Sequence, residues 1–122
     1  MKYLLDTHVW LWWMAGDPLS SEASTAIADP DNDVYLSAVS VWEAAIKASL
    51  GKLDVPDTLM AESAQFEELA ISWVHADSVG VLPMHHRDPF DRLLIAQGRT
   101  ESAIVITRDL AFEDYDVEVM WA

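Results

Sequence analysis

Five short apolar runs, separated by stretches with helical spacing, restrict the fold of this chain more than any other feature. Each run is about four residues long and is bounded by turn or capping residues, which is typical of short buried strands. Strands that alternate with helices predict an α/β fold with a mainly parallel sheet, because parallel strands need crossover connections. The strands are expected at residues 2–5, 34–37, 71–74, 103–106 and 117–120, the last at an edge of the sheet.

The helices are expected at residues 9–15, 20–28, 40–50, 56–69 and 89–100, whereas residues 75–84 fit a helical turn and a loop. Gly16 and Gly51 follow the first and third of these helices, where a left-handed residue commonly ends a helix. The first helix is apolar on every side and carries three of the six tryptophans. Such a helix is either buried in the core or covered by a partner.

Composition limits the class of protein. A chain of 122 residues, 52% of them hydrophobic, predicts one domain with a substantial core. The lack of cysteine excludes disulfides and thiolate metal sites and favours a reducing cytoplasm, and no apolar run approaches the length of a membrane span. The formal net charge of −14 argues against salt-driven binding to a nucleic-acid backbone. The acids therefore serve solubility, or converge on a cation or a basic partner, or both.

Four acidic residues stand near the ends of the expected elements. Asp6 and Asp109 follow two of the strands, and Glu43 lies in the first turn of the helix after the strand at 34–37. In open parallel sheets, functional sites collect beyond the carboxyl ends of the strands. Asp91 is the exception, because its helix precedes a strand and only packing brings it to this edge.

Each of these acids also has a purely structural interpretation. At the start of the helix at 89–100, Asp88 caps the helix and Pro89 suits its first position. Asp91 then either complements the helix dipole or serves as a metal ligand. The structural interpretations of the other three are a capping box of Ser40 with Glu43, a cap of the first helix by Asp6 and a cap of a turn by Asp109.

Six pieces stand in order along the chain: residues 4–8 (LLDTH), 37–43 (SAVSVWE), Lys47, 51–53 (GKL), 86–97 (HRDPFDRLLIAQ) and 106–109 (ITRD). Together they resemble PIN domains, and specifically the VapC toxins of toxin–antitoxin pairs. The resemblance covers nearly the whole chain and implies a single PIN domain over residues 1–122, with a three-layer α/β/α, Rossmann-like fold.

The resemblance implies a Mg²⁺-dependent ribonuclease, with Mn²⁺ as an alternative cofactor. It places the family's metal-binding acids on Asp6, Glu43, Asp91 and Asp109, with direct metal contacts expected from Asp6 and Asp91. Hard carboxylates suit these ions, which can activate water and neutralise charge on a phosphoryl group. Thr7, Asp88 and Thr107 are expected to support these ligands from behind, and His8, His85 and His86 are interpreted as loop or capping residues rather than ligands.

The positions of the basic residues and the expected partners bear on the argument that the acidic net charge disfavours nucleic-acid binding. Four of the seven bases lie beside the motifs, where they either steer RNA or form ordinary surface ion pairs. They are Lys47, Arg87, Arg92 and Arg108. The resemblance further implies a VapB-type antitoxin that covers a groove, a homodimer, and a heterotetramer or larger assembly with the antitoxin. An acidic, tryptophan-rich chain suits a basic partner.

Other functions fit the sequence less well. A dehalogenase-like phosphotransferase needs a second Asp two residues after the first, and His8 stands there. A receiver-like domain does not explain the ordered motifs. A PIN fold that only binds proteins remains an alternative, although all four acids are present.

Overall fold

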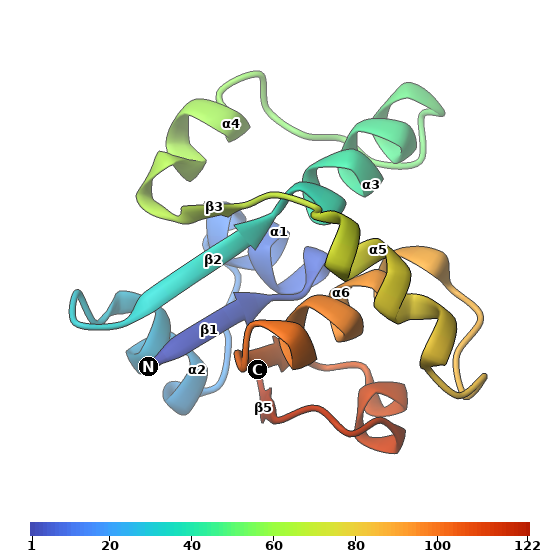
Figure 1. Cartoon of the computed structure of the whole chain (residues 1–122). Helices are drawn as coiled ribbons and strands as arrows, with labels where there is room; N and C mark the ends of the chain where they lie inside the picture. The colour runs from blue at the N-terminus through green and yellow to red at the C-terminus, as the bar shows by residue number, and fades with distance from the viewer.

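A sheet of five parallel strands forms the centre of the molecule in the computed structural model, which describes residues 1–122 (Figure 1). The strand order is β3-β2-β1-β4-β5, so β1 lies in the middle and β3 and β5 at the edges. All neighbouring strands pair in parallel, which confirms the predicted α/β fold. The strands are β1 (Lys2–Leu5), β2 (Asp33–Ser37), β3 (Glu67–Leu69), β4 (Ile104–Thr107) and β5 (Val119–Trp121).

Helices cover both faces of this sheet. The α-helices are α1 (Thr7–Ala15), α2 (Ser21–Ala28), α3 (Ala38–Ser49), α4 (Leu59–Glu62), α5 (Trp73–Ser78) and α6 (Pro89–Thr100). Three short 3-10 helices complete the structure: η1 (Ser63–Gln65), η2 (Val79–Val81) and η3 (Leu110–Asp114). None of the helices has the length and apolar character that crossing a membrane would require.

Alternate residues of the strands supply two separate cores. In β1, Leu5 packs with α1, α2 and α4 on one face, and Leu4 packs with α6 and η3 on the other. Trp10 is fully buried in the first core, whereas Trp12 and Trp13 are partly buried at its margin. The chain therefore has the three layers that were predicted, with the sheet between two helical layers.

The predicted helix at 56–69 and the predicted strand at 71–74 are wrong. Only α4 and η1 are helical, and Phe66 is extended and leads into β3, which pairs with β2. Edge pairing gives the backbone of β3 hydrogen-bond partners, and this outweighs the helical spacing of Leu59, Phe66 and Leu69. At 71–74, Ser72 and His75 form a reciprocal capping box that starts α5 instead of a strand.

Two helices start earlier than expected. The α3 helix begins at Ala38, and Ser37 caps it by accepting a hydrogen bond from the Val39 N–H. Glu43 therefore lies in the second turn, and the predicted capping box of Ser40 with Glu43 is wrong. The α1 helix begins directly after β1, at Thr7. Both starts bring a helix to the carboxyl edge of the sheet without an intervening loop.

The order of the strands creates a crevice at this edge. The chain runs from β1 through β2 to β3, and then returns to place β4 on the other side of β1. The carboxyl ends of β1 and β4 are therefore adjacent at the point where the direction reverses, which is where ligands bind in such sheets. Because α6 ends beside the start of β4, its first turn lies at the opposite, carboxyl edge. This placement brings Asp91 to the crevice.

Candidate functional site

An acidic cleft of about 370 Å³ lies at this crevice. Five of its nine lining residues are acidic, and only one is hydrophobic. The lining residues are Asp6, His8, Trp12, Glu43, Lys47, Asp88, Asp91, Arg108 and Asp109. The four acids singled out in the sequence are thus brought together from α3, α6 and the ends of β1 and β4.

Asp6 is held by β1 and β4 rather than used as a helix cap. Its side chain is 5% exposed and makes no capping bond to α1. The Thr107 hydroxyl donates a hydrogen bond of 2.7 Å to Asp6 Oδ2, while Oδ1 is buried without a partner. Burial raises the pKa of Asp6, and the bond from Thr107 opposes this. Thr107 therefore supports Asp6 directly, whereas Thr7 donates to the Ser40 hydroxyl.

Glu43 presents a second buried oxygen to the cleft. It is 2% exposed, and its Oε2 lies 2.5 Å from Lys47 Nζ, one helical turn further along α3. The other oxygen, Oε1, is buried without a partner. The nearby carboxylate raises the pKa of Lys47 and keeps it charged. Buried carboxylate oxygens without a partner are costly, so these two oxygens are candidate ligand atoms.

Asp91 is crowded by like charges. Burial, followed by the nearby charges of Asp6 and Asp88, raises its pKa to about 7. Asp88 accepts hydrogen bonds from the N–H groups of Phe90 and Asp91, so its predicted capping role is confirmed. Because Asp88 already accepts hydrogen bonds from these N–H groups in the first turn of α6, the Asp91 side chain is not needed as a cap and faces the cleft.

Asp109 caps a turn and faces the cleft at the same time. Its Oδ1 accepts a hydrogen bond from the Ala111 N–H at the start of η3, as the structural interpretation expected. Its Oδ2 lies 3.2 Å from His86 Nε2. The capping interpretation and the site interpretation are therefore compatible, because the two oxygens are used separately.

His86 is the functional candidate that sequence reasoning missed. Its Nε2 lies 2.9 Å from Asp91 Oδ2 and 3.2 Å from Asp109 Oδ2, so the ring bridges two of the four acids. These three residues form a group with the spacing of metal ligands. His8 packs against Trp12, and His85 packs edge-on against Tyr115. No periodicity marks His86; its one sequence signal is its place at the head of the motif that contains Asp91.

The four candidate RNA-contacting bases fall into different environments. Lys47 and Arg108 line the cleft, whereas Arg87 is exposed outside its lining. Arg108 packs over Trp12 at 4.3 Å and donates to the carbonyls of Pro18 and Ala122.

Arg92 is buried, unlike the exposed base that an RNA contact would require. Its guanidinium donates to the Tyr115 hydroxyl and to four backbone carbonyls, those of Val79, Leu82, Pro83 and His86. These bonds tie the segment between α5 and α6 to the start of α6. Arg92 thus shapes the loop that carries His86 instead of binding a substrate.

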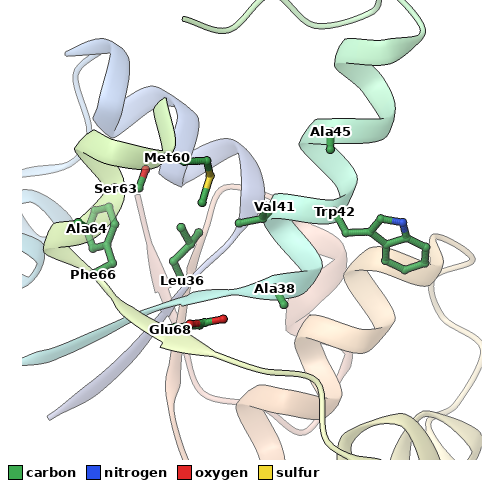
Figure 2. A pocket seen from close by; sticks show the side chains of 10 residues that line it. All are labelled: Leu36, Ala38, Val41, Trp42, Ala45, Met60, Ser63, Ala64, Phe66 and Glu68. Atoms are coloured by element: carbon green, nitrogen blue, oxygen red, sulfur yellow. The ribbon is translucent and has the colours of Figure 1, made fainter. Parts of the chain in front are cut away.

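A second cavity, of about 500 Å³, has a different character (Figure 2). It lies between α3, α4 and β3, and eight of its ten lining residues are hydrophobic. In Figure 2, Leu36, Val41 and Met60 point toward one another across it, and Glu68 is its one charged residue. This cavity lacks the groups needed for hydrolysis, so the candidate for chemistry is the acidic cleft.

Sequence comparison identifies the fold. The profile of the PIN domain family matches residues 3–118. The chain belongs to the PIN domain family. No curated protein sequence matches it significantly.

Several solved structures align with nearly the whole chain. VapBC2 from Rickettsia felis, bound to a promoter DNA fragment, aligns with a TM-score of 0.77 at 15% identity over 99% of this chain and 98% of that one. DNA-bound VapBC from Salmonella typhimurium gives 0.73 at 15% identity over 99% and 98%. VapBC-5 from Mycobacterium tuberculosis gives 0.63 at 23% identity over 98% and 96%. At these identities the alignments establish the shared PIN fold.

Proposed function

We propose that this PIN domain is a Mg²⁺- or Mn²⁺-dependent endoribonuclease that acts as the toxin of a VapBC-type toxin–antitoxin pair. The single observation that carries the proposal is the pair of buried, unpartnered oxygens, Asp6 Oδ1 and Glu43 Oε1, in a cleft with three more carboxylates. Oxygen donors without a hydrogen-bond partner suit a hard divalent cation. The site therefore fits the cofactor that the family resemblance implies.

The acids have distinct proposed roles. Asp6 and Asp91 contact the metal directly, and Glu43 and Asp109 complete its surroundings directly or through water. When bound, the metal supplies charge neutralisation at the phosphoryl oxygens and a lower pKa for the attacking water. Thr107 holds Asp6 in position through its 2.7 Å hydrogen bond, and one of the outer carboxylates orients the water.

The basic residues at the rim provide local attraction for RNA. Lys47 and Arg108 border the acids, so a phosphate in the cleft meets positive charge from α3 and from the end of β4. Because the chain as a whole carries a formal charge of −14, we expect modest and selective RNA binding rather than a broad basic groove. An RNA substrate also fits action in the cytoplasm.

The proposed partner is a VapB-type antitoxin. The structural relatives described above are VapBC proteins, and VapBC-5 is a member of the VapBC family of toxin–antitoxin systems. The acidic charge of this chain complements a basic antitoxin segment. We propose a homodimer of the toxin, with a heterotetramer or larger assembly formed with the antitoxin.

The test uses the full chain, purified without its antitoxin and incubated with structured RNAs. We expect cleavage with Mg²⁺ or Mn²⁺, none with EDTA, and none for Asp6→Asn or Asp91→Asn. Glu101→Gln is a matched control, because it removes a carboxylate charge at the other end of α6. Cleavage that persists in EDTA contradicts the metal mechanism. If no RNA is cleaved and expression causes no growth arrest, the domain is a protein-binding module instead.

A further inference from the structure

The hydrogen bonds of His86 define which of its ring nitrogens carries the proton. Its Nδ1 lies 3.3 Å from the backbone nitrogen of Asp88, and that N–H can only donate. The Nδ1 atom is therefore the acceptor, so the proton of the neutral ring is on Nε2. The Nε2 atom makes a 3.2 Å hydrogen bond with Asp109 Oδ2 and lies 2.9 Å from Asp91 Oδ2.

This arrangement differs from that of a histidine that binds a metal. A ligating histidine gives a lone pair to the ion and donates its other ring N–H to a neighbouring acceptor. Here the nitrogen that faces the acids carries the hydrogen, and the other nitrogen accepts a hydrogen bond. The ring thus offers the carboxylates a hydrogen-bond donor. In a metal-bound site, a cation would stabilise these carboxylates instead.

The side chain of His86 can rotate away from Asp91 and Asp109 while the backbone of its loop stays in place. Its backbone N–H donates to the Tyr115 hydroxyl at 2.7 Å, and its carbonyl accepts from Arg92. These bonds hold the main chain from the side of the second core, whereas the His86 side chain is about one-fifth exposed and contacts two of the acids that line the cleft. Rotation of the ring therefore breaks its hydrogen bonds with the Asp88 N–H and with Asp109 Oδ2 and its close contact with Asp91 Oδ2, whereas the backbone bonds of His86 do not involve the ring.

We propose that His86 is a placeholder, meaning a hydrogen-bond donor that occupies the cation's position between Asp91 and Asp109 and is displaced when a divalent metal binds. The inference rests on the proposed function, because it assumes that the acidic cleft takes a metal. The unpartnered oxygens of Asp6 and Glu43, two other residues that line the cleft, are the independent sign of that metal.

The proposal predicts the sign of a mutational effect. If the His86 donor must be displaced, removing it leaves the metal-free site less stable and the metal-bound site unchanged. The thermodynamic cycle then requires tighter metal binding, by the same free energy that the metal-free protein loses. A ligand role predicts the opposite sign, because removing a ligand weakens metal binding.

Two substitutions at His86 separate the donor from the rest of the ring. The amide oxygen of Asn in His86→Asn can accept the Asp88 N–H as Nδ1 does, but Asn is too short to reach the acids. The longer Gln in His86→Gln can bring an N–H group near the position of Nε2. His85→Ala is the control for a neighbouring histidine that packs on Tyr115 and does not touch the acids.

The experiment is calorimetric titration of the full chain with Mn²⁺ at one fixed pH, together with melting curves in EDTA. We expect His86→Asn to bind Mn²⁺ about tenfold more tightly than the original protein, the scale of one hydrogen bond to a charged group. His86→Gln and His85→Ala should stay within about twofold. In EDTA, we expect His86→Asn to melt about 5 °C lower, and saturating Mn²⁺ to remove that difference.

The other outcomes overturn the proposal in distinguishable ways. Equal affinities in all four proteins mean that His86 does not compete, and weaker binding by His86→Asn makes it a ligand; both leave the proposed function intact. If none of the four proteins binds Mn²⁺, the metal site itself is wrong, and the proposed function fails with it.

Discussion

The two ends of α6 carry the same local arrangement with different consequences. At its C-terminal end, His75 accepts a backbone N–H on Nδ1, from Ser72, and faces Glu101 with Nε2 at 2.9 Å. At its N-terminal end, His86 accepts a backbone N–H on Nδ1, from Asp88, and faces two carboxylates. Both rings are held by an N–H two or three residues away in sequence and present a donor to acids.

The difference lies in what surrounds the acids. Glu101 is one carboxylate with about a third of its side chain exposed, so water shares its charge. Asp91 is more buried and stands beside Asp6, Asp88 and Glu43, and these charges help raise its pKa. His75 therefore completes a structural hydrogen-bond network. His86 instead contacts a cluster of carboxylates whose mutual repulsion must be relieved by a cation or by protons. The same pair of residue types is structural or functional according to the number of acids around it.

The largest expected contrast between the two ends is in metal binding. Asp91→Asn removes a proposed direct ligand, so we expect Mn²⁺ affinity and RNA cleavage to fall by at least about a hundredfold. Glu101→Gln makes the same chemical change at the other end and should leave both within about twofold. Calorimetric titration and a cleavage assay measure the two effects. Equal losses of Mn²⁺ affinity and cleavage in both variants would contradict the assignment of the metal site to the N-terminal end of α6.

The next largest contrast is in stability. His75 is 3% exposed and contacts Gln97, which in turn bonds to Ser37 and to the Ala70 carbonyl. We expect His75→Ala to lower the free energy of unfolding by about 3 kcal/mol, because it leaves buried polar groups unpaired and creates a cavity. Urea unfolding should give the same loss in EDTA and in Mn²⁺. A loss that Mn²⁺ abolishes would mean that His75 belongs to the metal site.

The stability of the metal-free protein should depend on pH because of the crowded carboxylates at the N-terminal end of α6. The pKa of Asp91 is raised from an unfolded value of 3.8 to about 7, so the folded state retains a proton that the unfolded state releases. That stabilisation is complete below pH about 4 and is lost as the pH rises to about 7. In EDTA at pH 8, we expect Asp91→Asn to be more stable than the original protein, by about 2 kcal/mol.

Urea unfolding of the two proteins between pH 4 and pH 8 measures this contrast. The difference should shrink toward acidic pH, where Asp91 is protonated and resembles Asn. A constant difference across this range would show that the charge of Asp91 is not the cause. Metal binding should strengthen over the same interval, since the bound carboxylate must lose its proton.

The parts of the fold that could be predicted from sequence are those fixed by local patterns. The runs of residues around Leu4 and Val105 are apolar on both sides of the chain, as expected for central strands, and they form β1 and β4. The Asp88–Pro89 start of α6 follows from capping chemistry alone. The failures lie at the β3 edge, because Phe66 and Leu69 fit a helical spacing and only pairing with β2 decides otherwise.

Some residues of the candidate site could likewise be placed from sequence patterns, and others could not. Asp6 and Asp109 follow strands, so the rule for parallel sheets is enough to place them. Asp91 seemed an exception because its helix precedes a strand, yet a helix that returns to the amino edge must start at the carboxyl edge. His86 could not be assigned, because its role depends on the distance between two acids that are 18 residues apart in the chain. The burial of Arg92 was equally hidden, since its partners are carbonyls of a loop.

The smallest expected effect tests the assignment of protons on which the comparison rests. If the His75 ring is neutral with its proton on Nε2, Glu101→Gln keeps an acceptor for that proton and loses only a charge. A negative charge at the C-terminal end of a helix is unfavourable, which offsets part of the weaker hydrogen bond. We therefore expect the free energy of unfolding to change by less than about 0.5 kcal/mol at pH 8. A loss of about 2 kcal/mol would instead indicate a charged imidazolium–carboxylate pair, and it would undermine the same reasoning for His86.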